Sequence, residues 1–129
     1  MLQALDRVVT IQDSCSHLDT VARFFRALSD PTRLKLLEYV LSGERTVADC
    51  VTHAGISQPR VSVHLACLTD CGYITSRWDE RKLRYSIGDP RVADLIVLAR
   101  ALAADNATAL DCCTKITTTL SKKADPNGR

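Results

Sequence analysis

The chain has 129 residues, of which 46% are hydrophobic and 25% charged, and its formal net charge is +2. This length suits one domain with a core of its own, and the weak positive charge neither requires nor excludes a nucleic-acid partner. The chain opens without a signal-peptide pattern and contains no apolar run long enough to span a bilayer. We therefore expect a cytoplasmic protein whose thiols are reduced.

Apolar spacing predicts the first two helices, and a stop-and-start signal separates them. Over residues 17–28, apolar side chains recur every three or four positions. Asp30 is a natural N-cap residue and Pro31 suits the first helical position, so a second helix begins there. It ends before Gly43.

Two more helices follow, joined by a tight turn at Gly55. The third is predicted over residues 46–53, with Cys50 as a small inward-facing hydrophobe. Ser57 is expected to cap the fourth helix, which stops before Gly72. The side chains of this helix that are expected to face the core are Val61, Leu65 and Leu68.

After Gly72 the hydrophobic period changes from about 3.6 to 2, which is typical of strands. Residues 73–78 and 82–87 predict a two-stranded hairpin with a charged tip. Within this hairpin, Trp78 and Tyr85 are expected to be packed.

The last predicted element is one long apolar helix. Asp89-Pro90 repeats the capping signal, and the helical period continues to about Thr114. Residues 1–16 are expected to form an N-terminal arm, residues 17–115 the folded domain, and residues 116–129 a disordered tail.

This order of elements predicts a mainly α fold with a small β-hairpin, a winged helix-turn-helix. The fourth helix would then lie in the major groove of operator DNA, where hydroxyl, amide and guanidinium groups reach base edges. The cations of the hairpin suit phosphate contacts. The residues predicted to contact double-stranded DNA are Ser57, Gln58, Arg60, Ser62, Val63, His64, Arg81, Lys82 and Arg84.

The chain has six cysteines, and a domain of this size does not need disulfides, so a soft-metal site is the leading interpretation. Cys67 and Cys71 are four residues apart, so about 40° of helix separates them and both sulfurs can meet one ion. Thiolates favour Cd(II), Pb(II), Hg(II) or As(III) over Mg(II) and Ca(II). Cys15 is expected to be a thiol without a role, with an extra metal ligand as the alternative.

Three segments carry a family resemblance: ALSDPTR at residues 27–33, SQPRVSVHL at 57–65 and KLRYSI at 82–87. Together they resemble the ArsR/SmtB metal-sensing repressors over roughly residues 18–110. The resemblance implies a homodimer, formed by the first and last helices, and not an enzyme. It also implies that the metal-free protein binds a palindromic operator and that metal binding releases it.

The family's metal sites differ, and two types do not fit this chain. The C-x-C of the arsenic-type site is absent near Cys50, and the last helix lacks the histidines of the zinc-type site. Residues 61–72 instead resemble the cadmium- and lead-sensing members, whose two cysteines are completed by one from the C-terminal region. The resemblance implies that Cys112 or Cys113, from the other subunit, supplies the third thiolate, and it leaves open which.

Four alternatives remain at this point. The adjacent Cys112 and Cys113 suit arsenite, an organoarsenical or Hg(II), and a thiol pair also suits a redox-sensing repressor. A DNA-binding module without a ligand is a third alternative. A cysteine enzyme using Cys67 with His64 is disfavoured, because a recognition helix offers no substrate pocket.

Overall fold

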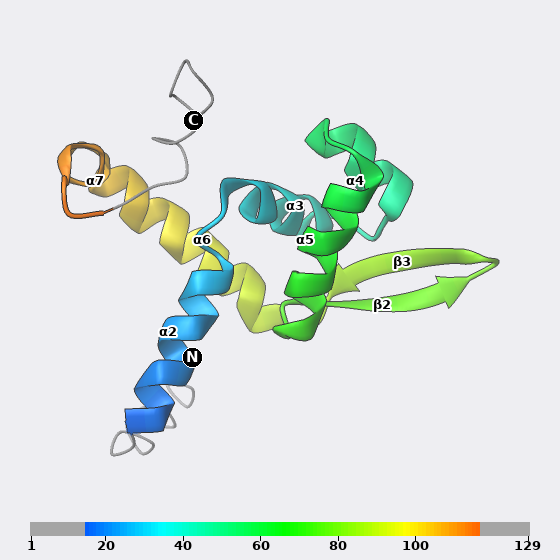
Figure 1. Cartoon of the computed structure of the whole chain (residues 1–129), viewed down its shortest axis with the longest axis horizontal. Coiled ribbons are helices and arrows are strands. Elements are labelled where there is room, and N and C mark those ends of the chain that lie inside the picture. Colours follow the sequence, from blue (N-terminus) through cyan, green and yellow to red (C-terminus); the bar gives the residue numbers. More distant parts are fainter. Residues whose placement is uncertain (1–14, 117–129) are drawn as a thin grey trace.

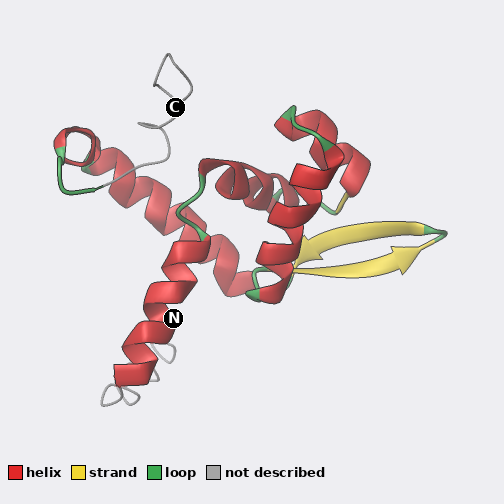
Figure 2. Cartoon of the chain, in the orientation of Figure 1, coloured by secondary structure: helices red, strands yellow, loops and turns green. Residues whose placement is uncertain are grey.

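The computed structural model describes residues 15–116, in which helices dominate and the strands are short (Figure 2). The helices are α2 (Cys15–Ala27), α3 (Pro31–Leu41), α4 (Val47–Ala54), α5 (Gln58–Asp70), α6 (Pro90–Asp105) and α7 (Ala107–Cys112). The strands are β1 (Arg45–Thr46), β2 (Ile74–Asp79) and β3 (Lys82–Ile87). The arm and tail expected at the two ends lie almost wholly outside the described residues, but α2 already includes Cys15 and Ser16.

Two regions are distinguishable in Figure 1. We call α3, α4, α5 and the three strands the head, and α2, α6 and α7 the flanking helices. The β2–β3 hairpin projects from one side of the head, while α2 and the α6–α7 segment extend away from it in other directions. This order and arrangement confirm the predicted winged helix-turn-helix, in which α4 and α5 form the helix pair.

The predicted capping signals account for where the helices begin. The Asp30 carboxylate accepts hydrogen bonds from the backbone N–H groups of Thr32 at 2.8 Å and Arg33 at 3.0 Å. Asp89 accepts one from the N–H of Arg91 at 2.9 Å. Ser57 stands at the N-cap of α5 in an extended conformation, but its side chain makes no capping hydrogen bond; the prediction that Ser57 caps this helix is therefore right only in position.

The three strands form one antiparallel sheet in the order β1-β3-β2. Across the hairpin, Ile74 pairs with Ile87 and Asp79 with Lys82. The two loop residues, Glu80 and Arg81, have φ values of 47° and 70°, which is the geometry of a tight two-residue hairpin turn. The two-residue strand β1, which no sequence pattern indicated, pairs with β3 and thereby ties the hairpin to the head.

The predicted single C-terminal helix is wrong: the structure divides it at Asn106. The backbone of Asn106 leaves the helical region at φ −114° and ψ 18°. Its side-chain Nδ2 donates a hydrogen bond to the Leu102 carbonyl at 2.8 Å, so the amide competes with the helical ladder. The apolar period continues through this break, which is why the period alone predicted one helix.

The core lies in the head and at the points where the flanking helices join it. Leu36, Leu37, Val61, Leu65 and Leu68 have no exposed surface. Within the described residues, no buried side chain precedes Ala27 or follows Ile96. No helix in this part of the chain has the length and apolarity needed to cross a bilayer.

Candidate functional site

The N-terminal half of α5 presents an exposed face. Ser57, Gln58, Arg60, Ser62 and Val63 are all exposed, and 67% of the Val63 surface is accessible. The opposite face carries the buried Val61 and Leu65, so the helix is anchored in the core on one side while its outer side chains stay exposed. This is the arrangement that a helix needs to enter a major groove.

His64 lies at the edge of this face rather than on it. The side chain is half-buried, and it lines a shallow depression together with Pro59, Arg60 and Val63. A charge on His64 would also favour the ionised form of Asp30, the cap of α3. His64 therefore lies between the exposed face of α5 and the start of α3.

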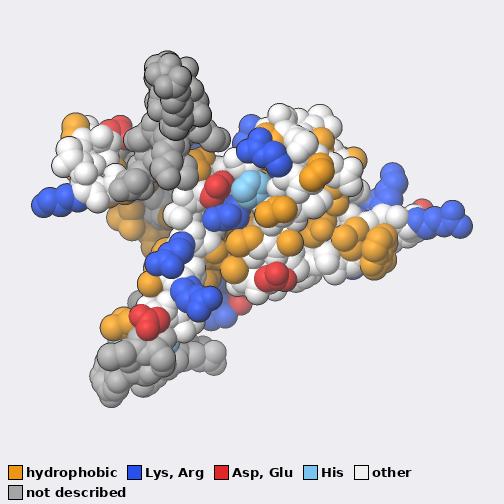
Figure 3. Space-filling view, in the orientation of Figure 1, with side chains coloured by type: hydrophobic (Ala, Val, Ile, Leu, Met, Phe, Trp, Pro, Cys, Tyr) orange, Lys and Arg blue, Asp and Glu red, His pale blue; other side chains and the backbone are white. Residues whose placement is uncertain are grey.

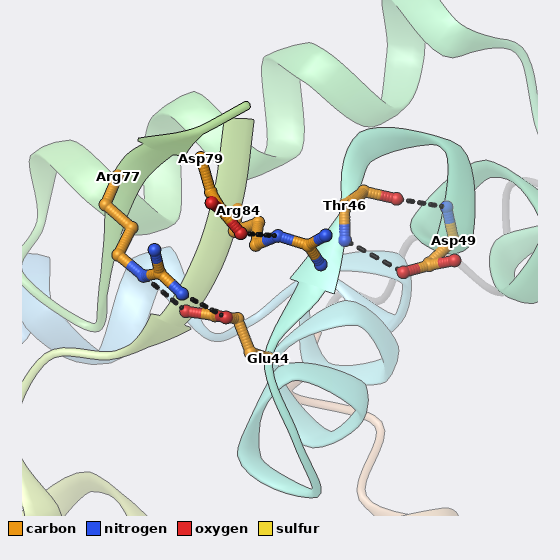
Figure 4. A network of polar contacts seen from close by, with 6 residues as sticks. All are labelled: Glu44, Thr46, Asp49, Arg77, Asp79 and Arg84. Atoms are coloured by element: carbon orange, nitrogen blue, oxygen red, sulfur yellow. Dashed lines mark hydrogen bonds and ion pairs between the residues drawn. The ribbon is translucent and has the colours of Figure 1, made fainter. Parts of the chain in front are cut away.

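The predicted wing cations do not share one environment. Arg81 and Lys82 are exposed at the hairpin tip, where Lys and Arg side chains gather in Figure 3. Arg84 is half-buried, and its Nε donates to the Asp79 carboxylate at 3.0 Å (Figure 4). Arg81 and Lys82 are therefore accessible for contact with a phosphate group, whereas the ion pair of Arg84 joins the two strands of the hairpin.

Ion pairs and caps fix the base of the wing (Figure 4). Arg77 of β2 forms a bidentate pair with Glu44, with N–O distances of 2.8 and 3.0 Å. The capping box of α4 lies alongside, where Thr46 and Asp49 exchange hydrogen bonds of 2.9 and 3.1 Å. The ion pair ties β2 to the residue before β1, and the capping box orders the start of α4 beside it.

The expectation that Trp78 packs within the hairpin is wrong. Trp78 lies opposite Leu83 on the hairpin, and 70% of its surface is accessible. Tyr85, two residues further along β3, is buried as expected at 9%. Tyr85 belongs to the core cluster of the head and Leu83 packs partly against it, whereas Trp78 does neither.

The C-terminal end of α5 carries the predicted thiol pair. Cys67 is half-buried against the core, and Cys71 is the exposed C-cap residue of the helix. Partial burial of its sulfur and the neighbouring Cys67 thiol, with which it hydrogen-bonds, raise the pKa of Cys71, and Arg33 lowers it. The two thiols are thus close enough to interact, and one soft ion bound by both as thiolates would displace the proton of each.

Two neighbours of this pair were not predicted. Arg33 of α3 is near enough to favour the Cys71 thiolate. Tyr73 follows the pair by two residues, and its buried hydroxyl reaches α2. The Gly72-Tyr73 sequence after the helix was a signal for this position, but the contact with α2 joins residues 49 positions apart and has no local signature.

Cys112 and Cys113 lie at the far end of α7, remote from the Cys67–Cys71 pair (Figure 1). Cys112 is exposed, whereas Cys113 is half-buried and lines an apolar depression with Leu102, Leu110 and Ile116. Within residues 15–116 of one chain, no three His, Cys, Asp or Glu side chains are grouped so as to hold an ion. A third thiolate at the Cys67–Cys71 pair would therefore have to come from elsewhere.

Cys50 differs from the other four cysteines whose side chains are described. Its side chain has no exposed surface, and burial together with Asp49 raises its pKa to about 11. This confirms the prediction of a small core hydrophobe. Cys15 begins α2, but its side chain lies outside the described part of the chain.

Comparison with known proteins gives one consistent answer. Residues 30–76 match the pattern described as "Bacterial regulatory protein, arsR family". A "Probable mercury resistance operon repressor" of Streptomyces lividans is 72% identical over 109 residues, covering 84% of this chain and 87% of that protein. The HTH-type transcriptional regulator CmtR of Mycobacterium tuberculosis (strain ATCC 25618 / H37Rv) is 37% identical over 57% of this chain and 62% of its own length.

Solved structures share the fold. The crystal structure of M. tuberculosis Rv0081 superposes with a TM-score of 0.71 at 27% identity, covering 77% of this chain and all of that one. The homodimeric winged helix-turn-helix domain of Mb0332 from Mycobacterium bovis gives a TM-score of 0.67 at 30% identity, covering 74% of this chain and 87% of that one.

Proposed function

Because the chain belongs to the ArsR family of bacterial regulatory proteins, we propose that it is a homodimeric repressor controlled by a thiophilic metal ion. The metal-free dimer binds operator DNA, and ion binding at Cys67 and Cys71 releases it. The observation that carries this proposal is that the two thiols lie together at the C-terminal end of α5, the helix whose first turns are exposed.

Mercury(II) is the first candidate for the ion. The relative that is 72% identical is described as a probable mercury resistance operon repressor, and that identity extends over most of both chains. A thiolate pair is also a suitable donor set for a soft ion of this kind. Cadmium(II) and lead(II) are the second candidate, favoured by the resemblance of residues 61–72 to the cadmium- and lead-sensing members.

The DNA contacts divide into base reading and phosphate binding. Ser57, Gln58, Arg60, Ser62 and Val63 reach base edges, with His64 at the rim of that surface. Arg81 and Lys82 contact phosphates beside the groove. Arg84 contributes through the shape of the wing, because Asp79 already pairs with its guanidinium.

The dimer is formed by the flanking helices of two copies. Exposed apolar side chains on α2 and α6 support this assignment, namely Leu18, Phe25, Val97, Leu98 and Leu102. A second copy also offers the missing third thiolate, from its Cys112 or Cys113. Cys113 is the favoured donor, because it lies in the apolar depression of α6–α7 rather than on an open surface.

Operator release measured ion by ion tests the proposal. Operator is first selected from random duplex DNA with the metal-free protein, and release is then titrated with Hg(II), Cd(II), Pb(II), As(III) and Zn(II) in the presence of a reductant, which suppresses a disulfide switch. Cys67→Ser/Cys71→Ser should bind operator as wild type does and lose release by the active ion, because a hydroxyl is a poor ligand for a soft ion.

Cys50→Ala is the matched control, since it removes a thiol from the same head without touching the pair. Cys112→Ser and Cys113→Ser, made separately, identify the third ligand by the larger loss. If Cys67→Ser/Cys71→Ser still releases operator at the ion concentration that wild type needs, the site lies at other thiols. Release only after oxidation would make the protein a redox sensor instead.

A further inference from the structure

Tyr73 joins the thiol-bearing end of α5 to helix α2. Its side chain is fully buried, and its hydroxyl donates a hydrogen bond of 2.6 Å to the Phe24 carbonyl oxygen. Its ring also packs on the Phe24 ring, with centroids 4.7 Å apart. One residue thus makes both a polar and an apolar contact with the last turn of α2.

The backbone of Tyr73 closes the same turn of α5 that carries the thiols. Its N–H donates to the Leu68 carbonyl at 2.9 Å, and the N–H of Gly72 donates to Thr69 at 3.1 Å. This pair of bonds, with Gly72 at φ +85°, is a Schellman motif in which Cys71 is the cap. Because Cys67 lies just before this motif and Cys71 within it, a change in their separation must act on Tyr73.

The last turn of α2 depends on side chains from the head. A helix leaves its final four carbonyl groups without helical partners. The carbonyl groups of Phe25 and Arg26 accept hydrogen bonds from the backbone N–H groups of Leu28 and Ser29. The other two carbonyls, of Phe24 and Ala27, accept from Tyr73 at 2.6 Å and from Arg33 Nε at 2.7 Å.

We infer that the Tyr73 hydroxyl is a coupling group that transmits ion binding at Cys67 and Cys71 to α2 and so to the dimer. The inference rests on the proposed function and specifies its regulation. Ion binding fixes the distance between two sulfurs on the capped turn, the turn shifts Tyr73, and Tyr73 shifts the C-terminal cap of α2. Since α2 carries exposed Leu18 and Phe25, its orientation sets how two copies meet and how far apart their α5 helices lie.

Tyr73→Phe tests this directly, because it keeps the ring and removes the hydroxyl. Operator affinity is measured without ion and with saturating Hg(II), and Hg(II) affinity is measured separately by thiolate-to-metal charge-transfer absorption. The ratio of the two operator affinities should fall about 2- to 13-fold, the range that one hydrogen bond supplies. Both the metal-free operator affinity and the Hg(II) affinity should stay within about twofold of wild type.

Tyr85→Phe is the matched control, since it removes the hydroxyl of another buried tyrosine and should leave the ratio unchanged. A wild-type ratio in Tyr73→Phe would overturn the inference, as would an equal loss in Tyr85→Phe. A merely structural Tyr73 would change the unfolding midpoint but not the ratio.

Amide exchange separates this inference from the proposed function and needs no variant. Adding Hg(II) to the metal-free wild-type protein should alter exchange at Leu28 and Ser29, next to the α2 cap. Altered amide exchange without operator release would support the coupling through Tyr73 and contradict the proposed repressor function. Operator release with unaltered exchange at these two amides would support the proposed repressor function and contradict the coupling through Tyr73.

Discussion

The head and the flanking helices differ in how far their apolar side chains are buried. In the head, Leu36, Leu37, Leu65 and Leu68 have no exposed surface. On the flanking helices, apolar side chains remain open, with exposed fractions of 66% for Leu18, 55% for Phe25, 69% for Val97, 57% for Leu98 and 55% for Leu102. Apart from Val63 and Trp78, large apolar side chains are therefore covered within one chain in the head. On the flanking helices most of them stay exposed beyond the junction with the head, where Val92 and Ile96 are buried.

This difference separates the tasks of the two regions. The head buries a core within one chain, which supports the exposed face of α5. The flanking helices leave apolar side chains exposed, which the proposed dimer would cover, so in that dimer they would set the spacing of two heads. The capped ends of α2 and α5 lie where the regions join, which is where a signal can change the dimer without disturbing either core.

The largest expected effect comes from the flanking helices. Leu98→Glu/Leu102→Glu places two charges on the exposed apolar side of α6, so we expect monomers that keep a folded head. Operator affinity should fall by about 10²- to 10⁴-fold, because binding through two linked half-sites is lost. Analytical ultracentrifugation and helical circular dichroism measure the two outcomes.

Thr52→Glu/Lys35→Glu is the control, since both positions are exposed in the head. A Leu98→Glu/Leu102→Glu protein that sediments as a dimer would contradict the division into regions. Leu95 is not used, because it packs partly against the core of the head.

The next effect concerns the exterior of the head. Arg60→Ala should weaken operator binding by about 1–3 kcal/mol if Arg60 reads a base. Lys82→Ala should weaken it less and reduce its salt dependence, since a phosphate contact carries no sequence information. Fluorescence of Trp78, the single tryptophan and exposed on the wing, reports binding at each salt concentration. If operator affinity is unchanged in both variants, the assignment of the α5 face and the wing as the DNA-binding surface is wrong.

The smallest effect concerns the interior of the head and depends on pH. Burial raises the pKa of Cys50 to about 11, above that of an exposed thiol, so the unfolded chain loses this proton first. The stabilising contribution of the buried neutral thiol is thus complete below the unfolded pKa of about 8.5 and is lost as the pH rises toward 11. Between pH 8 and pH 10.5, denaturant unfolding should show a larger loss of stability in wild type than in Cys50→Ala. Equal losses would mean that Cys50 is not buried as described.

The local signals of the sequence were enough for most of the head and for the start of α6. Asp30-Pro31, Asp89-Pro90 and Gly72 mark helix ends because each acts through its own backbone or one a few residues away. The switch in hydrophobic period marks the hairpin. Burial of Cys50 and Leu65 follows from their position on a helical face. The closeness of Cys67 and Cys71 was also predictable, because an i,i+4 pair is close on any helix.

Tertiary structure decided what depends on partners distant along the chain. Three features have no signature in the hydrophobic period of the sequence: the pairing of β1 with β3, the exposure of Trp78 and the separation of Cys112 from Cys67. The break at Asn106 is a local feature that the apolar period hid, because the side-chain amide of Asn106 bonds the Leu102 carbonyl four residues earlier. The bond from Tyr73 to Phe24 depends on α2 and α5 meeting in space, since a side-chain hydroxyl reaches whatever acceptor the packing brings to it.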